Sequence, residues 1–569
     1  MASPAEQTAA LEMRLLEQAV GVDRPLARRD EICTNWPRMR FENNHEKRSR
    51  EMTRKREISR RNWLPIFAVL ALVIAFGPGA AVGQDAGKKA GDYPDEVTLF
   101  KNVNIFDGVS DTLMTGHDVM VVDNKIHKIA KDIPTSGSYE VEVTTRKERK
   151  VTMPSDWGSG YTITTKDGDL TTETKQVKVN VIEGGGRTLL PGFIETHAHL
   201  MLMGPSLPAM EAGTTWEDFA IHGTRMAEMY LMQGFTTVRD AGGANGGLRR
   251  AIDAGQIVGP RYYPSGAFLG TRGGHADFAN FSSPVGESTN FGRLNMAQEV
   301  DNVADVQKYG RNNFRMGATQ LKFMQSGGVV SAFDPWQLLA GSPEEIQAAV
   351  QVANEYGSYV MAHSYRKEAI MNALNAGVKS IEHGFAFDCE IAEMMKEKGA
   401  YITTNLTAFD PGLLEIPAVA SVPSSLAKAK SASATFAGYI DNMKKCPVKR
   451  GFQTDCVGSV EACNIQIAYE KHLNNEFFGP YQSLVTMTST GGEIVALSGD
   501  FMNPYPDGKL GVIEESAYAD ILIVDGNPLE DFSVVGTGDK WFDAEPRPES
   551  PETIRLIMKD GVIYKNTLN

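Results

Sequence analysis

The sequence predicts an α/β protein in which a (β/α)8 TIM barrel is joined to a smaller β-sandwich domain built from both ends of the mature chain. The 569 residues are enough for a barrel of about 250 residues and a second module. Between residues 191 and 499, short apolar runs alternate with helical patterns, which is typical of a parallel sheet. Strand-like sequence flanks that region at 92–190 and 500–569.

The first 84 residues are predicted to be a leader. A basic run starts at Met52, an apolar run of 14 residues spans Trp63 to Phe76, and small residues follow up to Gly83. This order is typical of a secretory signal peptide, and the apolar run is shorter than the roughly 20 residues that cross a bilayer. We therefore expect a signal peptide at about 52–83, preceded by a stretch that reflects a mis-called start, and an exported body that is periplasmic or secreted. The alternative is a chain anchored by an uncleaved N-terminal segment.

The β domain is expected in two parts. Residues 97–107 and 118–126 are predicted strands, the second with a turn inside it. Residues 134–182 are rich in Thr, Lys, Glu and Val and are predicted to be extra hairpins inserted in this domain. Residues 519–525 and 554–564 return to a strand pattern, so the C-terminal part is expected to rejoin the first.

Eight strand candidates fall in the barrel region, with helical patterns such as 343–353 between them. They are the run that ends at His197 and the segments 236–240, 262–267, 320–323, 359–363, 380–383, 400–405 and 452–455. Eight such units match a closed barrel, whose active site lies at the carboxyl ends of its strands.

Polar side chains stand at those ends. His197 and His199 are two residues apart, so both imidazoles face one side of a strand. His363, His383 and Asp455 each end a later candidate strand, and Lys322 interrupts an apolar run. Four imidazoles, one carboxylate and a lysine suit borderline divalent ions such as Zn²⁺. By contrast, His117, His127 and His222 lie on segments that look exposed or helical, and we do not expect them to be ligands.

Two segments carry a resemblance to a known family. Residues 190–199, Leu-Pro-Gly-Phe-Ile-Glu-Thr-His-Ala-His, resemble the first-strand signature of the amidohydrolase superfamily, and residues 511–529 resemble its C-terminal signature. The most similar branch is the imidazolonepropionase-like one, which includes prolidases, Xaa-Arg/Lys carboxypeptidases and ochratoxin-type amidases. The resemblance covers residues 97–569 outside the insertion at 134–182. One departure is Gln453, where the family usually has Gly before Thr-Asp.

The resemblance implies two divalent metal ions, most simply Zn²⁺. His197, His199 and Asp455 would bind a buried ion, His363 and His383 would bind an exposed one, and Lys322, carbamylated by CO₂, would bridge them. A bridging hydroxide would attack the amide carbonyl, and Asp455 would act as general base and then acid.

Three further residues are candidates for substrate contact. The resemblance to prolidase-like enzymes implies that Tyr365 donates to the oxyanion. His275 and Arg366 would hold a substrate carboxylate, for which arginine is well suited.

The predicted function is therefore binuclear hydrolysis of the amide bond of a dipeptide or an N-acyl amino acid. The alternatives are a cyclic-amide hydrolase or deaminase of the same superfamily, and a non-catalytic barrel that serves as a binding scaffold. A net charge of −14 argues against nucleic acid as a partner. A homo-oligomer is expected by analogy with relatives, and stable membrane insertion only if the leader stays uncleaved.

Three other features of the sequence bear on its function and fold. The glycine-rich run 242–247 lacks GxGxxG spacing, so it does not indicate a nucleotide site. The chain has no Gly-x-Ser-x-Gly elbow, which argues against a serine hydrolase. Cys446, Cys456 and Cys463 fall within 18 residues, and the sequence leaves open whether two of them form a disulfide.

Overall fold

The computed structural model describes residues 96–568, apart from short gaps at 136–138, 147–148, 153–161, 166–169, 205–206, 332, 416 and 421. The predicted leader lies outside this part of the chain. Within the described ranges, no helix has both the length and the hydropathy required to cross a bilayer.

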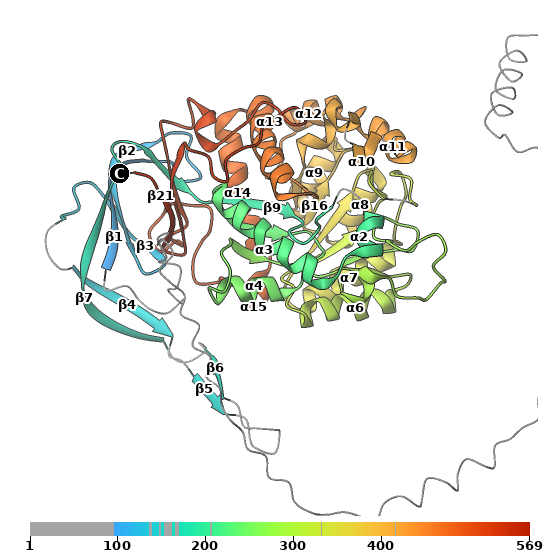
Figure 1. Cartoon of the computed structure of the whole chain (residues 1–569), viewed down its shortest axis with the longest axis horizontal. Helices are drawn as coiled ribbons and strands as arrows, with labels where there is room; N and C mark the ends of the chain where they lie inside the picture. Colours follow the sequence, from blue (N-terminus) through green and yellow to red (C-terminus); the bar gives the residue numbers. More distant parts are fainter. Residues whose placement is uncertain are drawn as a thin grey trace, which may run out of the picture. The chain divides into compact units, whose positions relative to one another are not determined.

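The smaller domain is built on a nine-stranded sheet to which both ends of the described chain contribute (Figure 1). Its strands are β1 (Glu96–Ile105), β2 (Met114–Val122), β3 (Lys125–Ala130), β4 (Tyr139–Arg146), β7 (Leu170–Glu183), β8 (Thr188–Pro191), β19 (Ile521–Val524), β20 (Ile554–Lys559) and β21 (Val562–Asn566). The antiparallel pair β8–β19 joins the early strands to the late ones. The predicted return of the C-terminal part is therefore confirmed.

The predicted insertion contains two nested hairpins. Strand β4 pairs antiparallel with β7, and between them β5 (Arg149–Thr152) pairs antiparallel with β6 (Thr162–Thr165). Strand β7 then returns to the sheet as a parallel neighbour of β1.

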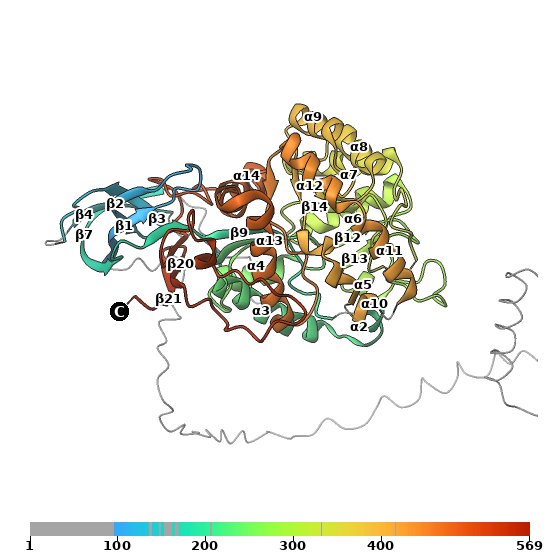
Figure 2. The same cartoon turned by 90° about the horizontal axis from the view of Figure 1, so that it is seen from above.

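The barrel consists of short buried parallel strands (Figure 2). They are β9 (Phe193–Ala198), β10 (Phe235–Asp240), β11 (Arg261–Tyr263), β12 (Phe268–Gly270), β14 (Leu321–Met324), β15 (Val360–Ser364), β16 (Ser380–His383), β17 (Tyr401–Thr403) and β18 (Arg450–Gly451), with β13 (Ala297–Glu299) beside β12. In place of the single predicted strand at 262–267, the chain forms two short consecutive strands, β11 and β12. Nearly continuous burial explains why these strands lack a polar alternation.

Backbone hydrogen bonds close the barrel at two places between the sheets. The amide of Thr196 donates to the carbonyl of Phe452 at 2.9 Å, and the amide of Thr319 donates to the carbonyl of Pro264 at 2.7 Å. The strands from β9 to β18 therefore form a closed ring, and the predicted fold class is confirmed.

One predicted strand is displaced. Strand β18 covers only Arg450–Gly451, and residues 452–457 follow without regular structure. In this segment the carbonyl of Phe452 and the amide of Asp455 both bond to β9, so the chain follows β9 irregularly instead of extending the strand. Asp455 therefore stands on a loop and not at a strand end.

Helices cover the outside of the ring. They are α2 (Leu207–Gly213), α3 (Trp216–Met232), α4 (Gly246–Asp253), α5 (Asn290–Arg293), α6 (Val303–Arg315), α7 (Pro343–Glu355), α8 (Lys367–Ala376), α9 (Cys389–Lys398), α10 (Pro417–Ala420), α11 (Pro423–Ser433), α12 (Phe436–Lys445), α13 (Val460–Met487), α14 (Ser489–Ala496) and α15 (Gly499–Met502). Single 3-10 turns occur at η2 (Leu406–Phe409), η3 (Pro411–Glu415) and η4 (Phe532–Val535).

Helix α7 shows how the sequence sets these boundaries. Ser342 accepts from the amide of Glu345, whose carboxylate accepts from the amide of Ser342, and Pro343 occupies the first turn. This reciprocal capping satisfies donors that have no partner within the helix. The inner face of α7, including Ile346, then packs against the barrel.

Candidate functional site

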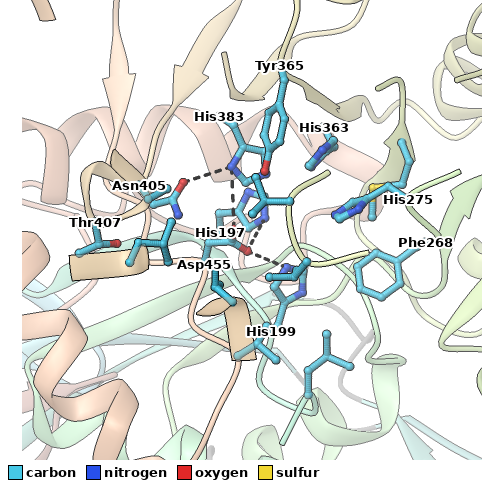
Figure 3. A pocket seen from close by; sticks show the side chains of 18 of the residues that line it. His197, His199, Phe268, His275, His363, Tyr365, His383, Asn405, Thr407 and Asp455 are labelled. Carbon is cyan, nitrogen blue, oxygen red and sulfur yellow. Dashed lines mark hydrogen bonds and ion pairs between the residues drawn. The ribbon is translucent and has the colours of Figure 1, made fainter. Parts of the chain in front are cut away.

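The carboxyl ends of the barrel strands surround a cavity of about 220 Å³ (Figure 3). All six side chains predicted as metal ligands line it: His197, His199, Lys322, His363, His383 and Asp455. They form two sets. We call His197, His199, Lys322 and Asp455 the inner group, and His363 and His383 the outer group.

The inner group converges on Asp455. Its Oδ1 lies 3.1 Å from Nε2 of His199 and 3.4 Å from Nε2 of His197. The nearest ligand atoms of these three residues lie within 4.8 Å of one another, as a single metal ion requires. Nζ of the buried Lys322 lies 3.2 Å from Nε2 of His197, and burial lowers the pKa of this amine to about 8.

The hydrogen bond behind His199 supports a cation site. Its Nδ1 lies 3.0 Å from the carbonyl oxygen of Gly242, which can only accept, so the ring carries a proton on Nδ1. In the neutral ring, the Nε2 lone pair therefore faces the carboxylate of Asp455. Two acceptors at 3.1 Å need a cation between them, either a proton or a metal ion, and the chemistry of this donor set fits a divalent metal.

His197 is supported by a buried carboxylate. Its Nδ1 lies 2.6 Å from Oε2 of Glu382, which also receives two hydrogen bonds of 3.0 Å from Arg239. Burial alone would raise the pKa of Glu382, but Arg239 and His197 hold it well below its usual value. Glu382 is therefore ionised, fixes the Nδ1 proton of His197 and makes the ring a stronger ligand.

Glu195 connects the two chain segments of the inner group. Its Oε1 accepts from the amide of His197 at 2.8 Å and from the amide of Thr454 at 3.3 Å. It therefore holds the segment before Asp455 against β9. Burial raises the pKa of Glu195 to about 8.

Two of the predicted ligands have a backbone conformation that side chains rarely adopt. His383 has φ = 71° and Asp455 has φ = 51°, and neither is glycine. Such geometry costs of order 1–3 kcal/mol per residue and gathers at functional sites, where the surroundings maintain it. Here it turns both side chains toward the cavity.

The outer group hydrogen-bonds to neutral partners, and the carboxylate oxygen Oδ2 of Asp455 lies 3.9 Å from Nδ1 of His383. Nε2 of His363 lies 3.1 Å from the carbonyl oxygen of Gly327, and Nδ1 of His383 lies 3.2 Å from Oδ1 of Asn405 and 3.0 Å from Nε2 of Gln453. Burial lowers the pKa of His363 well below its usual value and that of His383 to about 3, so both rings are neutral. Neutral imidazoles are the form that binds a metal.

Tyr365 and His275 lie in the cavity beside the outer group. The ring of Tyr365 stacks on Phe385 at 4.2 Å, and its hydroxyl points toward the histidines (Figure 3). His275 stacks on His363 with ring centroids 4.3 Å apart. A Cβ atom on Gly328 would lie 2.0 Å from the His275 ring, so the approach of this loop requires glycine.

Arg366 does not reach the site. Its guanidinium pairs with Glu368 at 2.8 Å and with the carbonyl of Gln337 at 2.9 Å, and it is not among the residues that line the cavity. The residue follows Tyr365 at the start of α8, where consecutive side chains point in different directions. Its predicted contact with a substrate carboxylate is therefore not supported by its position.

Two disulfides are present in the described part of the chain. Cys456, directly after Asp455, bonds to Cys463 in the first turn of α13, and Cys389 bonds to Cys446. The sequence left the pairing of the last three cysteines open. It gave no reason to join Cys389 to them, because 57 positions separate it from its partner.

Sequence reasoning missed the residues behind the rings. They are Glu195, Arg239, Glu382, Asn405 and Gln453, and all are buried. Three of them are charged residues inside apolar strand runs, a signal already used for Lys322. Which ring each one supports depends on pairing between strands, which the runs alone do not reveal.

Comparisons with known proteins agree with this geometry. The model of the amidohydrolase family matches residues 188–541. A prolidase solved in complex with N-methylphosphonate-L-proline is 30% identical, with a TM-score of 0.67 over 83% of this chain and 100% of that chain. The chain therefore belongs to the amidohydrolase family.

Ochratoxinase from Aspergillus niger is 29% identical over 397 residues, which span 66% of this chain and 75% of the relative. The crystal structure of A. niger ochratoxinase superposes with a TM-score of 0.63 at 23% identity, over 83% of this chain and 96% of that one, and shows the shared fold. The predictions of the family and of an enzyme that hydrolyses amide carbon–nitrogen bonds are confirmed.

Proposed function

We propose that this chain is a binuclear metal-dependent amidohydrolase that cleaves the amide bond of a dipeptide or an N-acyl amino acid. The observation that carries the proposal is the convergence of four imidazoles, a carboxylate and a buried lysine on one cavity. The inner group would hold one ion, and the outer group would hold a second. Zinc suits this set of nitrogen and oxygen ligands.

Lys322 is proposed to bridge the two ions as a carbamate. Its amine is buried and lies 3.2 Å from Nε2 of His197, in the cavity that the outer histidines also line. An amine with a lowered pKa is partly neutral near pH 8, and the neutral form adds CO₂. The product would be a carboxylate within reach of both groups.

The chain's own residues have complementary tasks in the reaction. Bound divalent ions would supply a Lewis acid and lower the pKa of a water from 15.7 to about 7. Burial alone would raise the pKa of Asp455, but the imidazoles of His197 and His199 hold it well below its usual value, so its carboxylate is ionised and can accept the water's proton and pass it to the leaving nitrogen. Burial raises the pKa of Tyr365 well above its usual value, so its hydroxyl remains a donor for the oxyanion.

The walls of the cavity favour a substrate with an apolar side chain. Phe268, Phe278, Val329, Leu413, Val419 and Trp541 line it, and Asp455 is the one carboxylate among its lining residues. Among these lining residues, a basic side chain would find no anionic partner apart from Asp455 of the inner group. His275, which lines the opposite wall beside His363, is proposed to contact the substrate carboxylate.

We also propose that the body is exported, since disulfides form and persist in oxidising compartments. The periplasm or the medium meets this condition, and an uncleaved N-terminal anchor would meet it as well. A homo-oligomer is part of the proposal, and sedimentation of the purified protein would test it.

Replacing Lys322 by Ala tests the proposal. We expect the purified wild type to contain two equivalents of metal and to cleave members of a library of Xaa-Pro, Xaa-Arg/Lys and aromatic N-acyl amino acids. Lys322→Ala should lose at least one equivalent and about 10³-fold or more in kcat, because an ion bridge is removed from the reaction centre. Elemental analysis and turnover with added zinc measure both.

A matched control is Lys471, another fully buried lysine. Lys471 lies on α13, donates to the carbonyls of Gln233 and Val535, and does not line the cavity. Lys471→Met should change stability but not metal content. The proposal is wrong if wild type holds no metal and gains no activity from it, or if Lys322→Ala keeps both metal and turnover.

A further inference from the structure

Gln453 links the outer group to the buried residues behind the inner one. Its side chain is fully buried, with Nε2 at 3.0 Å from Nδ1 of His383 and at 3.2 Å from Oδ1 of Asn405. Its Oε1 lies 2.6 Å from Oγ1 of Thr403, which in turn lies 2.6 Å from Oε2 of Glu382. The number of protons on each of these groups decides which of them donates and which accepts.

With the Gln453 amide in this orientation, Thr403 has too few protons for its two contacts. A hydroxyl has one proton to donate, yet Thr403 faces two acceptor oxygens at the same 2.6 Å distance. Because Glu382 is ionised, it accepts the hydroxyl proton of Thr403, so the oxygen of Gln453 would face a lone pair of Thr403 at 2.6 Å. A half-turn of the Gln453 amide replaces that oxygen with an N–H donor and removes the conflict.

The same half-turn resolves the contact with His383. With nitrogen beside it, Nδ1 of His383 would have to accept, so the single proton of the neutral ring would lie on Nε2. With oxygen there, Nδ1 carries the proton and shares it between the oxygens of Gln453 at 3.0 Å and Asn405 at 3.2 Å, which then lie 3.2 Å apart as two acceptors of one N–H in place of the bond between the two amides. The Nε2 lone pair of His383 is then available to the cavity.

We propose that Gln453 is a positioning residue whose carbonyl oxygen holds the Nδ1 proton of His383 and so prepares Nε2 to bind the second metal ion. This inference rests on the proposed binuclear function. Hydrogen bonds then run without a break from His383 through Gln453, Thr403 and Glu382 to Nδ1 of His197. This single hydrogen-bond network fixes the tautomer of one ring in the inner group and of one ring in the outer group.

This role belongs to the particular side chain. At position 453 the resemblance leads one to expect glycine, which has no atom that could reach His383. Gln453 also stands two residues before Asp455, so it lies on the segment that carries the carboxylate of the inner group. A residue that merely filled this space would need no polar atoms in these positions.

Gln453→Met tests the inference, since methionine keeps the length and removes the acceptor. We expect the second zinc equivalent to bind about 10–100-fold more weakly, as is typical when the partner behind a ligand is lost, and the first to bind as in wild type. Titration of the apoprotein with zinc in competition with a chelator measures both affinities. Gln453→Glu keeps an acceptor toward Nδ1 and should retain the second equivalent.

The control is Gln320→Met. Gln320 is an equally buried glutamine that donates to the backbone carbonyls of Asp240 and Tyr263 and does not contact His383. It should lose stability to a similar degree while both zinc affinities stay unchanged. A weaker second equivalent in this variant would assign the effect to general loosening and overturn the inference.

The remaining outcomes separate the inference from the function on which it rests. If wild type binds two equivalents and Gln453→Met binds both as tightly, Gln453 has no such role and the binuclear function stands. If wild type binds one equivalent, His383 binds no second ion, the inference is wrong, and only a metal site at the inner group remains supported. If wild type binds none, the proposed function fails too. Should Gln453→Met not fold, loss of the second equivalent in soluble Gln453→Glu would contradict the acceptor role.

Discussion

The inner and outer groups present the same kind of ring in differently built surroundings. Behind His197 lies an ionised carboxylate at 2.6 Å, itself held by Arg239, whereas His363 and His383 are backed by a loop carbonyl and by side-chain amides at 3.0–3.2 Å. A hydrogen bond to a charged group is roughly twice as strong as one between neutral groups. His197 is therefore fixed by a charged partner, whereas His199 and both rings of the outer group have neutral hydrogen-bond partners.

This difference has consequences for both metal binding and folding. The carboxylate behind His197 makes that ring a stronger ligand, so the first ion should bind more tightly than the second. Glu382 and Arg239 are also part of the barrel interior, with no exposed surface. Damage behind the inner group should affect stability and metal together, and damage behind the outer group should affect mainly the second metal.

The largest effect is expected from Glu382→Leu. It leaves the guanidinium of Arg239 buried without its carboxylate, which costs about 3–5 kcal/mol in free energy of unfolding. It also removes the acceptor that fixes the tautomer of His197, so the first zinc equivalent should bind about 10–100-fold more weakly. Urea unfolding of the apoprotein and chelator competition measure the two effects.

The double variant Arg239→Met with Glu382→Leu separates them. Removing both charges eliminates the unpaired ion, so most of the lost stability should return, while metal affinity stays low because His197 still lacks its acceptor. Recovery of metal affinity together with stability would show that Glu382 acts on the fold and not on the ring. The contrast between the two groups would then disappear.

An intermediate effect is expected from the disulfide next to the inner group. Cys456 follows Asp455 directly, and its bond to Cys463 fixes the loop that carries the carboxylate. Cys456→Ser with Cys463→Ser should lower kcat about 10-fold or more, because small displacements of a reacting group are costly. The loss of stability should be smaller than for the second disulfide, since only seven positions separate these cysteines.

The second disulfide is the matched control, because it joins helices away from the cavity. Cys389→Ser with Cys446→Ser opens a connection across 57 positions, so it should cost more stability, about 2–4 kcal/mol. Its kcat at a temperature where the protein is folded should equal that of wild type. If the two double variants lose the same share of kcat, the disulfide beside Asp455 has no special part in positioning it.

The contrast also explains what the sequence could reveal. Each ligand ends a strand run or interrupts one, and the carboxyl ends of barrel strands meet at one rim, so local pattern and fold class together predicted the six side chains. The residues behind them depend on neighbours across strands: Glu382 supports His197 because the ring closes between β9 and the segment after β18. Asp455 was expected on a strand, but closure of the barrel uses its backbone and leaves it on a loop.

The direction of a side chain at a strand end was the least predictable feature. Tyr365 and Arg366 both follow His363, and both were expected in the site. The first packs between His363 and Phe385, whereas the second begins α8 and turns outward. Nothing in the run of residues distinguishes them, because the turn into the helix decides which one faces the cavity.

The smallest effect is therefore expected at Arg366, which marks the edge of the outer group. Its contacts with Glu368 and the carbonyl of Gln337 are partly exposed, and ion pairs of this kind contribute about 0–1 kcal/mol. Arg366→Ala should change kcat/KM by less than a factor of about 3, because losing a partly exposed ion pair changes the free energy by only a few tenths of a kcal/mol. Steady-state kinetics on the substrate found in the library measures this. A rise in KM of tenfold or more with unchanged kcat would mean that Arg366 swings inward to hold the substrate carboxylate, and the outer group would then possess a charged residue of its own.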